Sequence, residues 1–199
     1  MRILVVGGAG DVGRAATSCL RSGHEIIIAG RKSGDVLVDL MDEASVAAMY
    51  EKVGRVDAVV ACTGHSHFGP VADMTPKQFL DGLKDKLMGQ INLVLLGLGQ
   101  VNDHGSFTLT SGILSHEPIR QGSNAAATDG AIDSFVMSAA IEMPRGLRIN
   151  AVSPGLLEVA AQKYDGYFPG HRAVSNHEVG LAFAKSIEGA VTGQIIRCE

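Results

Sequence analysis

The sequence has little of what marks several large classes of protein. Tryptophan is absent, and the 3 cysteines are far apart with no Cys-x-x-Cys pair, so neither a disulfide framework nor a structural zinc site is predicted. Charged residues make up 19% of the chain and the formal net charge is -4, which does not indicate a nucleic-acid partner or an anionic membrane. The first apolar run ends at Gly7 and is too short for a signal peptide or a membrane span. These absences favour a cytoplasmic globular protein without a nucleic-acid or membrane partner.

Glycine and short apolar runs are abundant instead. The chain has 25 glycines and is 46% hydrophobic, enough for one sizeable core at 199 residues. Strands apolar on both faces suit a buried parallel sheet, so we expect one α/β domain over 1–199, a doubly wound parallel sheet of about seven strands flanked by helices. The expected strands are 3–6, 25–29, 35–38, 56–61, 106–109, 148–152 and 194–196, and the expected helices are 12–20, 43–53, one from Thr75-Pro76, 87–101, 125–143 and 177–187.

A glycine loop follows the first expected strand. Gly7, Gly10 and Gly13 occupy the strand-to-helix turn, where glycines allow a tight turn, close approach of backbone to a pyrophosphate and close helix packing. Free N–H groups at the helix N-terminus, around Asp11 and Val12, would meet the phosphates. The motif predicts a Rossmann-type dinucleotide site, and a glycine-rich turn that only packs is the alternative.

The end of the second expected strand bears on the choice of cofactor. An acidic residue at this point would bind the adenosine ribose hydroxyls and favour NAD, but none is present. Arg31, Lys32 and Ser33 follow instead, and two cations with a hydroxyl suit a 2′-phosphate. We therefore expect NADP(H) rather than NAD(H), unless these residues are ordinary solvated loop residues.

Further motifs resemble those of the short-chain dehydrogenase/reductase family almost from end to end. Val38-Asp39-Leu40 resembles the family's acidic-apolar pair, which contacts the adenine. Thr63-Gly64 lies where the family has the end of an Asn-Asn-Ala-Gly motif, of which only the glycine is kept. The segment 146–155, GLRINAVSPG, is the most diagnostic, because it resembles the sixth strand and the turn, here Pro154-Gly155, that faces the nicotinamide.

The resemblance breaks at the residues that carry the family's chemistry. The family uses a Tyr as general acid and base with a Lys one helical turn later, but the matching positions are Ala125 and Asp129. Whatever the alignment, 87–162 contains no Lys and 51–163 contains no Tyr. The chain is similar to a small bacterial subgroup of the family that lacks the Tyr-x-x-x-Lys pair.

Other polar residues are candidates for the site. Ser111 matches the family's serine after the fifth strand and would hydrogen-bond a carbonyl; Lys86 replaces the family's Asn and would supply the missing cation, so these two are our catalytic candidates. A surface lysine extending into solvent is the alternative for Lys86. His116 is either a second acid/base candidate or a loop histidine. His65 and His67 have a spacing that suits a metal, but no third ligand is evident, so no metal site is predicted.

Two functions stay open at this point. The first is an NADP(H)-dependent oxidoreductase for a small carbonyl or alcohol with non-standard catalytic residues, and the second is a non-catalytic dinucleotide-sensing or partner-binding protein. The missing Tyr and Lys favour the second, whereas Ser111 and Pro154-Gly155 favour the first, and the intact glycine loop disfavours a scaffold without cofactor. The least regular stretch, 156–176, is the expected mobile flap, from which Tyr164 or Tyr167 would reach the site. No motif identifies the substrate.

Two expected helices, 87–101 and 125–143, are apolar over more than one face. A helix that covers a sheet buries one apolar stripe, so the second apolar face needs another partner. In the family that this chain resembles, the corresponding helices pack against their symmetry mates. We therefore expect a homodimer or homotetramer assembled through these two helices.

Overall fold

Seven parallel strands form one sheet in the computed structural model, which describes residues 1–20 and 23–199. The strand order is β3-β2-β1-β4-β5-β6-β7, so the direction of winding reverses between β1 and β4. Ligands of doubly wound sheets bind outside the carboxyl ends of the strands at this reversal. The sheet confirms the predicted fold class. The strands are β1 (Arg2–Val6), β2 (Glu25–Gly30), β3 (Val36–Leu37), β4 (Val56–Ala61), β5 (Val101–Thr110), β6 (Arg148–Pro154) and β7 (Ile195–Cys198).

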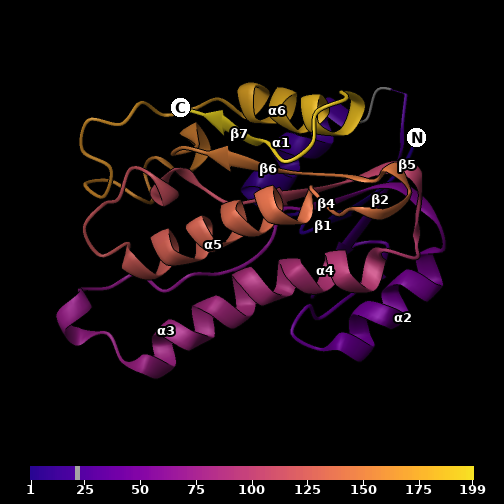
Figure 1. Ribbon diagram of the computed structural model, residues 1–199. Coiled ribbons are helices and arrows are strands. Elements are labelled where there is room, and N and C mark those ends of the chain that lie inside the picture. The colour runs from indigo at the N-terminus through magenta and orange to yellow at the C-terminus, as the bar shows by residue number, and fades with distance from the viewer. Residues whose placement is uncertain (21–22) are drawn as a thin grey trace.

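The α-helices of the described residues lie on both faces of this sheet. Figure 1 shows α1 and α6 on one face and α2, α4 and α5 on the other, while α3 extends from α4 beyond the sheet. A π-helical segment, Leu83–Met88, joins α3 to α4 without a break. None of the described helices is both long and apolar enough to cross a membrane. The helices are α1 (Asp11–Leu20), α2 (Glu43–Val53), α3 (Pro76–Gly82), α4 (Gly89–Gly97), α5 (Ser123–Ala139) and α6 (Asn176–Glu188).

The continuous apolar runs of the strands fill two separate cores. Along β1, Leu4 and Val6 belong to the core under α2, α4 and α5, whereas Ile3 and Val5 belong to the core under α1 and α6. Successive side chains of a strand point to opposite faces, so a strand covered on both sides must be apolar at every position. All four side chains are buried, as the sequence pattern of β1 predicts.

Several element boundaries follow the sequence pattern. The predicted helix 43–53 and strand 56–61 are confirmed residue for residue. Thr75 is the N-cap of α3 in a capping box with Gln78, and Pro76 occupies the first turn, as predicted.

The predicted bounds of two helices were wrong. The expected helix 87–101 is the end of a continuous helical stretch that begins at Pro76 and ends at Gly97, and Val101 already belongs to β5. The polar residues of 102–105 hid the first half of β5, which pairs with β4 through an irregular register. The expected helix 125–143 is α5, which ends at Ala139 because the next residues form tight turns before Pro144.

Candidate cofactor and active site

The glycine loop lies where β1 ends. The Gly7 N–H donates to the Ala29 carbonyl at 2.8 Å, and the Gly10 N–H donates to the Gly7 carbonyl at 3.0 Å. A Cβ on Gly7, which has φ +84°, would lie 2.4 Å from the Cys62 carbonyl oxygen, and one on Gly13 would lie 2.2 Å from the Gly7 carbonyl oxygen. These contacts are with backbone, so both glycines are required by the loop itself. A Cβ on Gly10 meets nothing nearer than 3.4 Å, so the loop's own packing does not demand glycine there.

A cleft of about 160 Å³ opens beside this loop. It lies at the carboxyl ends of β1 to β4, the place where a doubly wound sheet binds the adenosine part of a dinucleotide. Arg31 lines it, but Lys32 and Ser33 are exposed outside it. Of the other predicted cofactor residues, those that line this cleft are Gly7, Asp39, Leu40, Thr63 and Gly64.

A second cleft, of about 330 Å³, continues along the same edge of the sheet. The two clefts share Thr63, Gly64 and His65, so one groove passes the end of β4. Asp11, Val12 and the Pro154-Gly155 turn line this second cleft, whereas Gly10 and Gly13 line neither. Most of the predicted cofactor residues thus line one continuous groove at this edge of the sheet.

Ser111 lies at the end of β5 on the floor of the second cleft. It is 2% exposed, and its Oγ is buried without a hydrogen-bond partner among the described residues. Its backbone N–H donates to the Val152 carbonyl at 3.0 Å, and the preceding Thr110 exchanges two 2.8 Å hydrogen bonds with the Gln90 side chain. The Ser111 hydroxyl is therefore an unpaired buried polar group at the wall of the cleft, and a group of this kind is expected to have a hydrogen-bond partner.

Lys86 comes from the π-helical segment and extends into the same cleft rather than into solvent. Its Nζ forms an ion pair with Asp129 of α5 and donates a 3.0 Å hydrogen bond to the Ser111 carbonyl. The side chains of Lys86 and Asp129 are 15% and 4% exposed. Burial raises the pKa of the Asp129 carboxyl, and the neighbouring ammonium opposes this rise. The alternative of a solvent-extended surface lysine does not fit this geometry.

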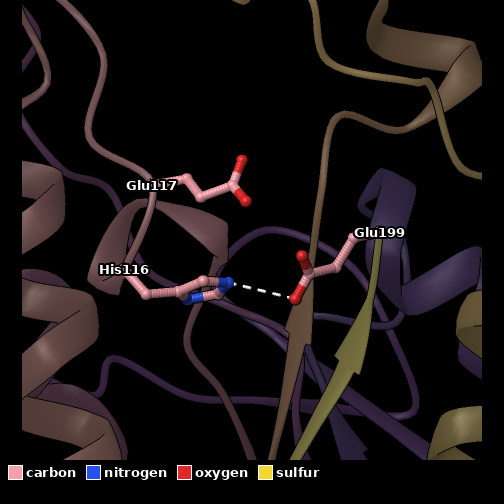
Figure 2. Close-up of side chains that lie close together, drawn as sticks. All are labelled: His116, Glu117 and Glu199. Carbon is pink, nitrogen blue, oxygen red and sulfur yellow. Dashed lines mark hydrogen bonds and ion pairs between the residues drawn. The ribbon is translucent and has the colours of Figure 1, made fainter.

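His116 points away from both clefts. Figure 2 shows it facing Glu199, with its Nε2 3.0 Å from Oε1 of that residue, and Glu117 close by. The ligand atoms of these three residues lie within 4.8 Å of one another. Arg197 lies 3.8 Å from the Glu199 carboxylate, and His171 lies 3.4 Å from the Glu117 carboxylate. The carboxylates are thus already paired in a network that joins the loop after β5 to the end of β7 and to the flap.

The other predicted candidates are dispersed. His65 is exposed at the junction of the two clefts, whereas the His67 N–H donates to the Asn124 side chain at 2.8 Å. Neither histidine belongs to a group of three possible metal ligands within the described residues. In the flap, Tyr164 lines the second cleft, while Tyr167 packs edge-on against Tyr164 with ring centroids 6.2 Å apart.

Sequence reasoning missed two contributors to the second cleft. From the sequence alone, Asp129 is only the position where the family's lysine is missing. Its contact with Lys86 was not predicted, because the two residues are 43 positions apart in the sequence. Phe68, which lines the cleft, packs against Tyr164 and Tyr167 with ring centroids 6.1 and 6.5 Å away. An acidic residue on α5 together with a lysine on the preceding helix was the available signal for the ion pair.

Comparisons with known proteins identify the family to which this chain belongs. A family model described as enoyl-(acyl carrier protein) reductase matches residues 14–193. The crystal structure of the protein lin1944 from Listeria innocua is 48% identical, with a TM-score of 0.97, over 99% of this chain and 98% of that one. A small-chain dehydrogenase in complex with NADPH is 25% identical, with a TM-score of 0.87, over 99% and 95% of the two chains.

Curated relatives are longer. Versicolorin reductase stcU of Emericella nidulans is 29% identical over 126 residues, which cover 62% of this chain and 46% of that protein. The short-chain reductase protein NovJ of Streptomyces niveus is 27% identical over 164 residues, 79% of this chain and 60% of that one. The matches thus span about half the length of these relatives. The family match over most of the chain, joined to the sheet order and the groove, shows that the protein belongs to the short-chain dehydrogenase/reductase family.

Proposed function

We propose that this protein is an NADP(H)-dependent oxidoreductase for a small carbonyl or alcohol, with Ser111 and Lys86 in place of the usual catalytic residues. The observation that carries the proposal is the buried, unpartnered Ser111 hydroxyl in a cleft that also receives the Lys86 ammonium. Both groups lie beside the Pro154-Gly155 turn, at the end of a groove that begins at the glycine loop. We also infer that the chain represents a small bacterial subgroup without the Tyr-x-x-x-Lys pair.

The groove fits a dinucleotide by its own geometry. Gly7 and Gly13 let the loop pack tightly at the end of β1, and Asp11 and Val12, whose backbone N–H groups would meet a pyrophosphate, line the groove. Arg31 would bind the 2′-phosphate, because it is the cation of its loop that lines the adenosine cleft. The NADPH complex of the related small-chain dehydrogenase supports this choice of cofactor.

The chemistry divides between the cofactor and two side chains. When bound, NADPH supplies a hydride to the carbonyl carbon of the substrate. The Ser111 hydroxyl donates a hydrogen bond to the carbonyl oxygen and stabilises the charge that develops on it. The Lys86 ammonium then gives its proton to that oxygen, which yields the alcohol and a neutral amine that regains a proton from water.

Cofactor binding is tested by calorimetric titration with NADPH and NADH. We expect Arg31→Ala to weaken NADPH binding roughly 10- to 100-fold, since a hydrogen bond to a charged group contributes about 1.5–3 kcal/mol, and to leave NADH binding unchanged. Lys32→Ala is the matched control, because Lys32 lies outside the cleft and should change neither affinity. Failure of both cofactors to bind the wild-type protein would overturn the proposal.

Catalysis is tested with a panel of small carbonyl compounds. Ser111→Ala and Lys86→Met should each lower kcat/KM by about 100-fold or more while NADPH affinity changes only a few-fold. Full activity in either variant would remove that residue from the mechanism. Tight NADPH binding without turnover of any carbonyl or alcohol would instead favour the non-catalytic dinucleotide sensor.

We further propose that the protein is a homodimer or homotetramer assembled through α4 and α5. Leu95 of α4 is 56% exposed, Met137 of α5 is 51% exposed, and Ile141 just beyond α5 is 88% exposed. Large apolar side chains gathered on two neighbouring helices are typical of a protein–protein interface.

A further inference from the structure

The Lys86–Asp129 ion pair joins two elements that line the second cleft, which is the proposed catalytic cleft. Lys86 belongs to the π-helical segment and Asp129 to α5, and the Lys86 ammonium also donates to the Ser111 carbonyl at 3.0 Å. Asp129 is 3% exposed. A buried charge is stable only when it is paired and hydrogen-bonded, so each partner needs the other at this depth.

Two glycines make the space that this pair occupies. A Cβ on Gly64, which has φ +117°, would lie 2.6 Å from the Cα and Cγ of Lys86. A Cβ on Gly112 would lie 2.6 Å from Oδ2 of Asp129. The loops after β4 and β5 therefore leave room for one partner each, and any larger residue would displace that partner from its place.

The π-helical segment directs neighbouring lysines in different directions. Lys84 is exposed, whereas Lys86 two residues later extends into the cleft. π-Helical turns are rare in proteins, and those that occur are found frequently at functional sites.

Asp129 is the acidic group that holds the ammonium. Within the described part of the chain, it is the carboxylate that forms an ion pair with Lys86. Burial raises the pKa of the Cys62 thiol to about 12, which keeps that neighbour neutral. The other titratable residues that line this cleft are Asp11, His65 and Tyr164. Asp85, on the same segment as Lys86, lines the adjoining cleft, and Asp133 lies one turn further along α5 from Asp129.

We propose that Asp129 is a positioning residue that keeps Lys86 protonated and aimed at Ser111, so that the catalytic cation comes from the π-helical segment instead of from α5. The roles of the two helices are thereby exchanged: α5 supplies the counter-charge and the preceding helix supplies the proton donor. The catalytic consequence rests on the proposed function, whereas the control of Lys86 protonation does not.

The test measures the protonation of Lys86 directly in the whole protein. Lysines are labelled with limiting acetic anhydride at a series of pH values, and peptide mass spectrometry gives the pH of half-maximal labelling for Lys86 and Lys84. In Asp129→Asn, the uncompensated buried ammonium loses its proton more readily, so the Lys86 midpoint should move to lower pH by about one unit or more. The Lys84 midpoint, as the internal control, should not move.

A second variant tests the same inference in case Asp129→Asn does not fold. Gly112→Ala places a Cβ against Oδ2 of Asp129 and should shift the Lys86 midpoint in the same direction. In Asp129→Glu, which keeps the charge, the midpoint should return toward the wild-type value. An unchanged Lys86 midpoint in folded Asp129→Asn or Gly112→Ala protein would overturn the inference.

Turnover separates this inference from the proposed function. If both hold, the alkaline limb of the kcat/KM profile for carbonyl reduction moves in Asp129→Asn to lower pH with the labelling midpoint, because Lys86 must be protonated to act. A shifted midpoint in a protein that turns over no carbonyl would leave the inference standing and remove the proposed function.

Discussion

The cleft that we propose binds the adenosine and the cleft that we propose is catalytic share one groove but are built in different ways. The first lies at the ends of β1 to β4 beside the glycine loop, whose tight backbone packing leaves no room for a side chain at Gly7 or Gly13. The second is shaped by side chains that arrive from separate elements, above all Ser111 from β5, Lys86 from the π-helical segment and Asp129 from α5. Tight backbone packing requires glycine at fixed positions of the loop. In the second cleft the positive charge comes from a side chain, so either of the two helical elements that line the cleft can supply it.

The largest expected effect is that of Gly13→Ala in the glycine loop, beside the first cleft. A Cβ there would lie 2.2 Å from the Gly7 carbonyl oxygen, so the loop must move and NADPH affinity should fall by about 100-fold, on the order of 3 kcal/mol. Gly99→Ala is the control, because no heavy atom lies within 4 Å of the added Cβ. Calorimetry with NADPH measures both, and wild-type affinity in Gly13→Ala would show that loop packing does not shape the cleft.

The second cleft shares a helix with the proposed interface, because α5 carries both Asp129 and the exposed Met137. Met137→Glu should weaken self-association at least about tenfold, because a charge at an apolar interface must be desolvated. Leu181→Glu is the matched control on α6, where Leu181 is 52% exposed. Sedimentation velocity over a range of concentrations measures the change.

Two outcomes would contradict this assignment of the interface. A monomeric wild-type protein at micromolar concentration would remove the oligomer altogether. Dissociation by Leu181→Glu and not by Met137→Glu would move the interface to the opposite helical layer.

The flap beside the catalytic cleft should make stability sensitive to acid. Glu178 closes a capping box with Ser175 at the start of α6 and pairs with Arg172 of the flap, and the Ser175 hydrogen bonds lower the pKa of Glu178 from 4.5 to about 2. Because the folded-state pKa is depressed, this contribution is fully present above about pH 4.5 and is lost as the pH falls toward 2.

Thermal unfolding against pH measures that contribution. Glu178→Gln should lower the melting temperature above pH 4.5, and its difference from the wild type should vanish near pH 2. Ser175→Ala, which removes the cap, should cost about 1 kcal/mol at neutral pH. A difference between Glu178→Gln and wild type that stays constant over this range would show that the charge of Glu178 is not responsible.

The smallest expected effect is at Gly130, the residue after Asp129 on α5. A Cβ at this position meets no heavy atom within 4 Å, and glycine is unfavourable inside a helix, so Gly130→Ala should stabilise the protein by up to about 1 kcal/mol. NADPH affinity should not change. Denaturant unfolding measures the gain, and a loss of stability would indicate that a partner molecule packs closely at this glycine.

The backbone-dependent features were predictable from the sequence. The glycine loop, the alternation of strands and helices, and the helix start at Thr75 follow from local conformational preferences and the burial of both sheet faces. The first half of β5 was missed because residues 102–105 lack an apolar pattern, and the end of the helix expected over 87–101 was therefore placed too late. Whether Arg31 or Lys32 approaches the adenosine cleft depends on how the loop turns, which composition does not reveal.

The sequence by itself determined that this chain forms a parallel doubly wound sheet with a glycine loop, because periodicity, glycine placement and apolar content are local properties. It also determined that α5 carries neither tyrosine nor lysine. Only the tertiary structure decided that Lys86 points into the cleft, that Asp129 meets it there, and that His116 turns instead toward Glu199. Those contacts join residues 43 and 83 positions apart, and their formation depends on the packing of whole elements, which no short stretch of sequence encodes.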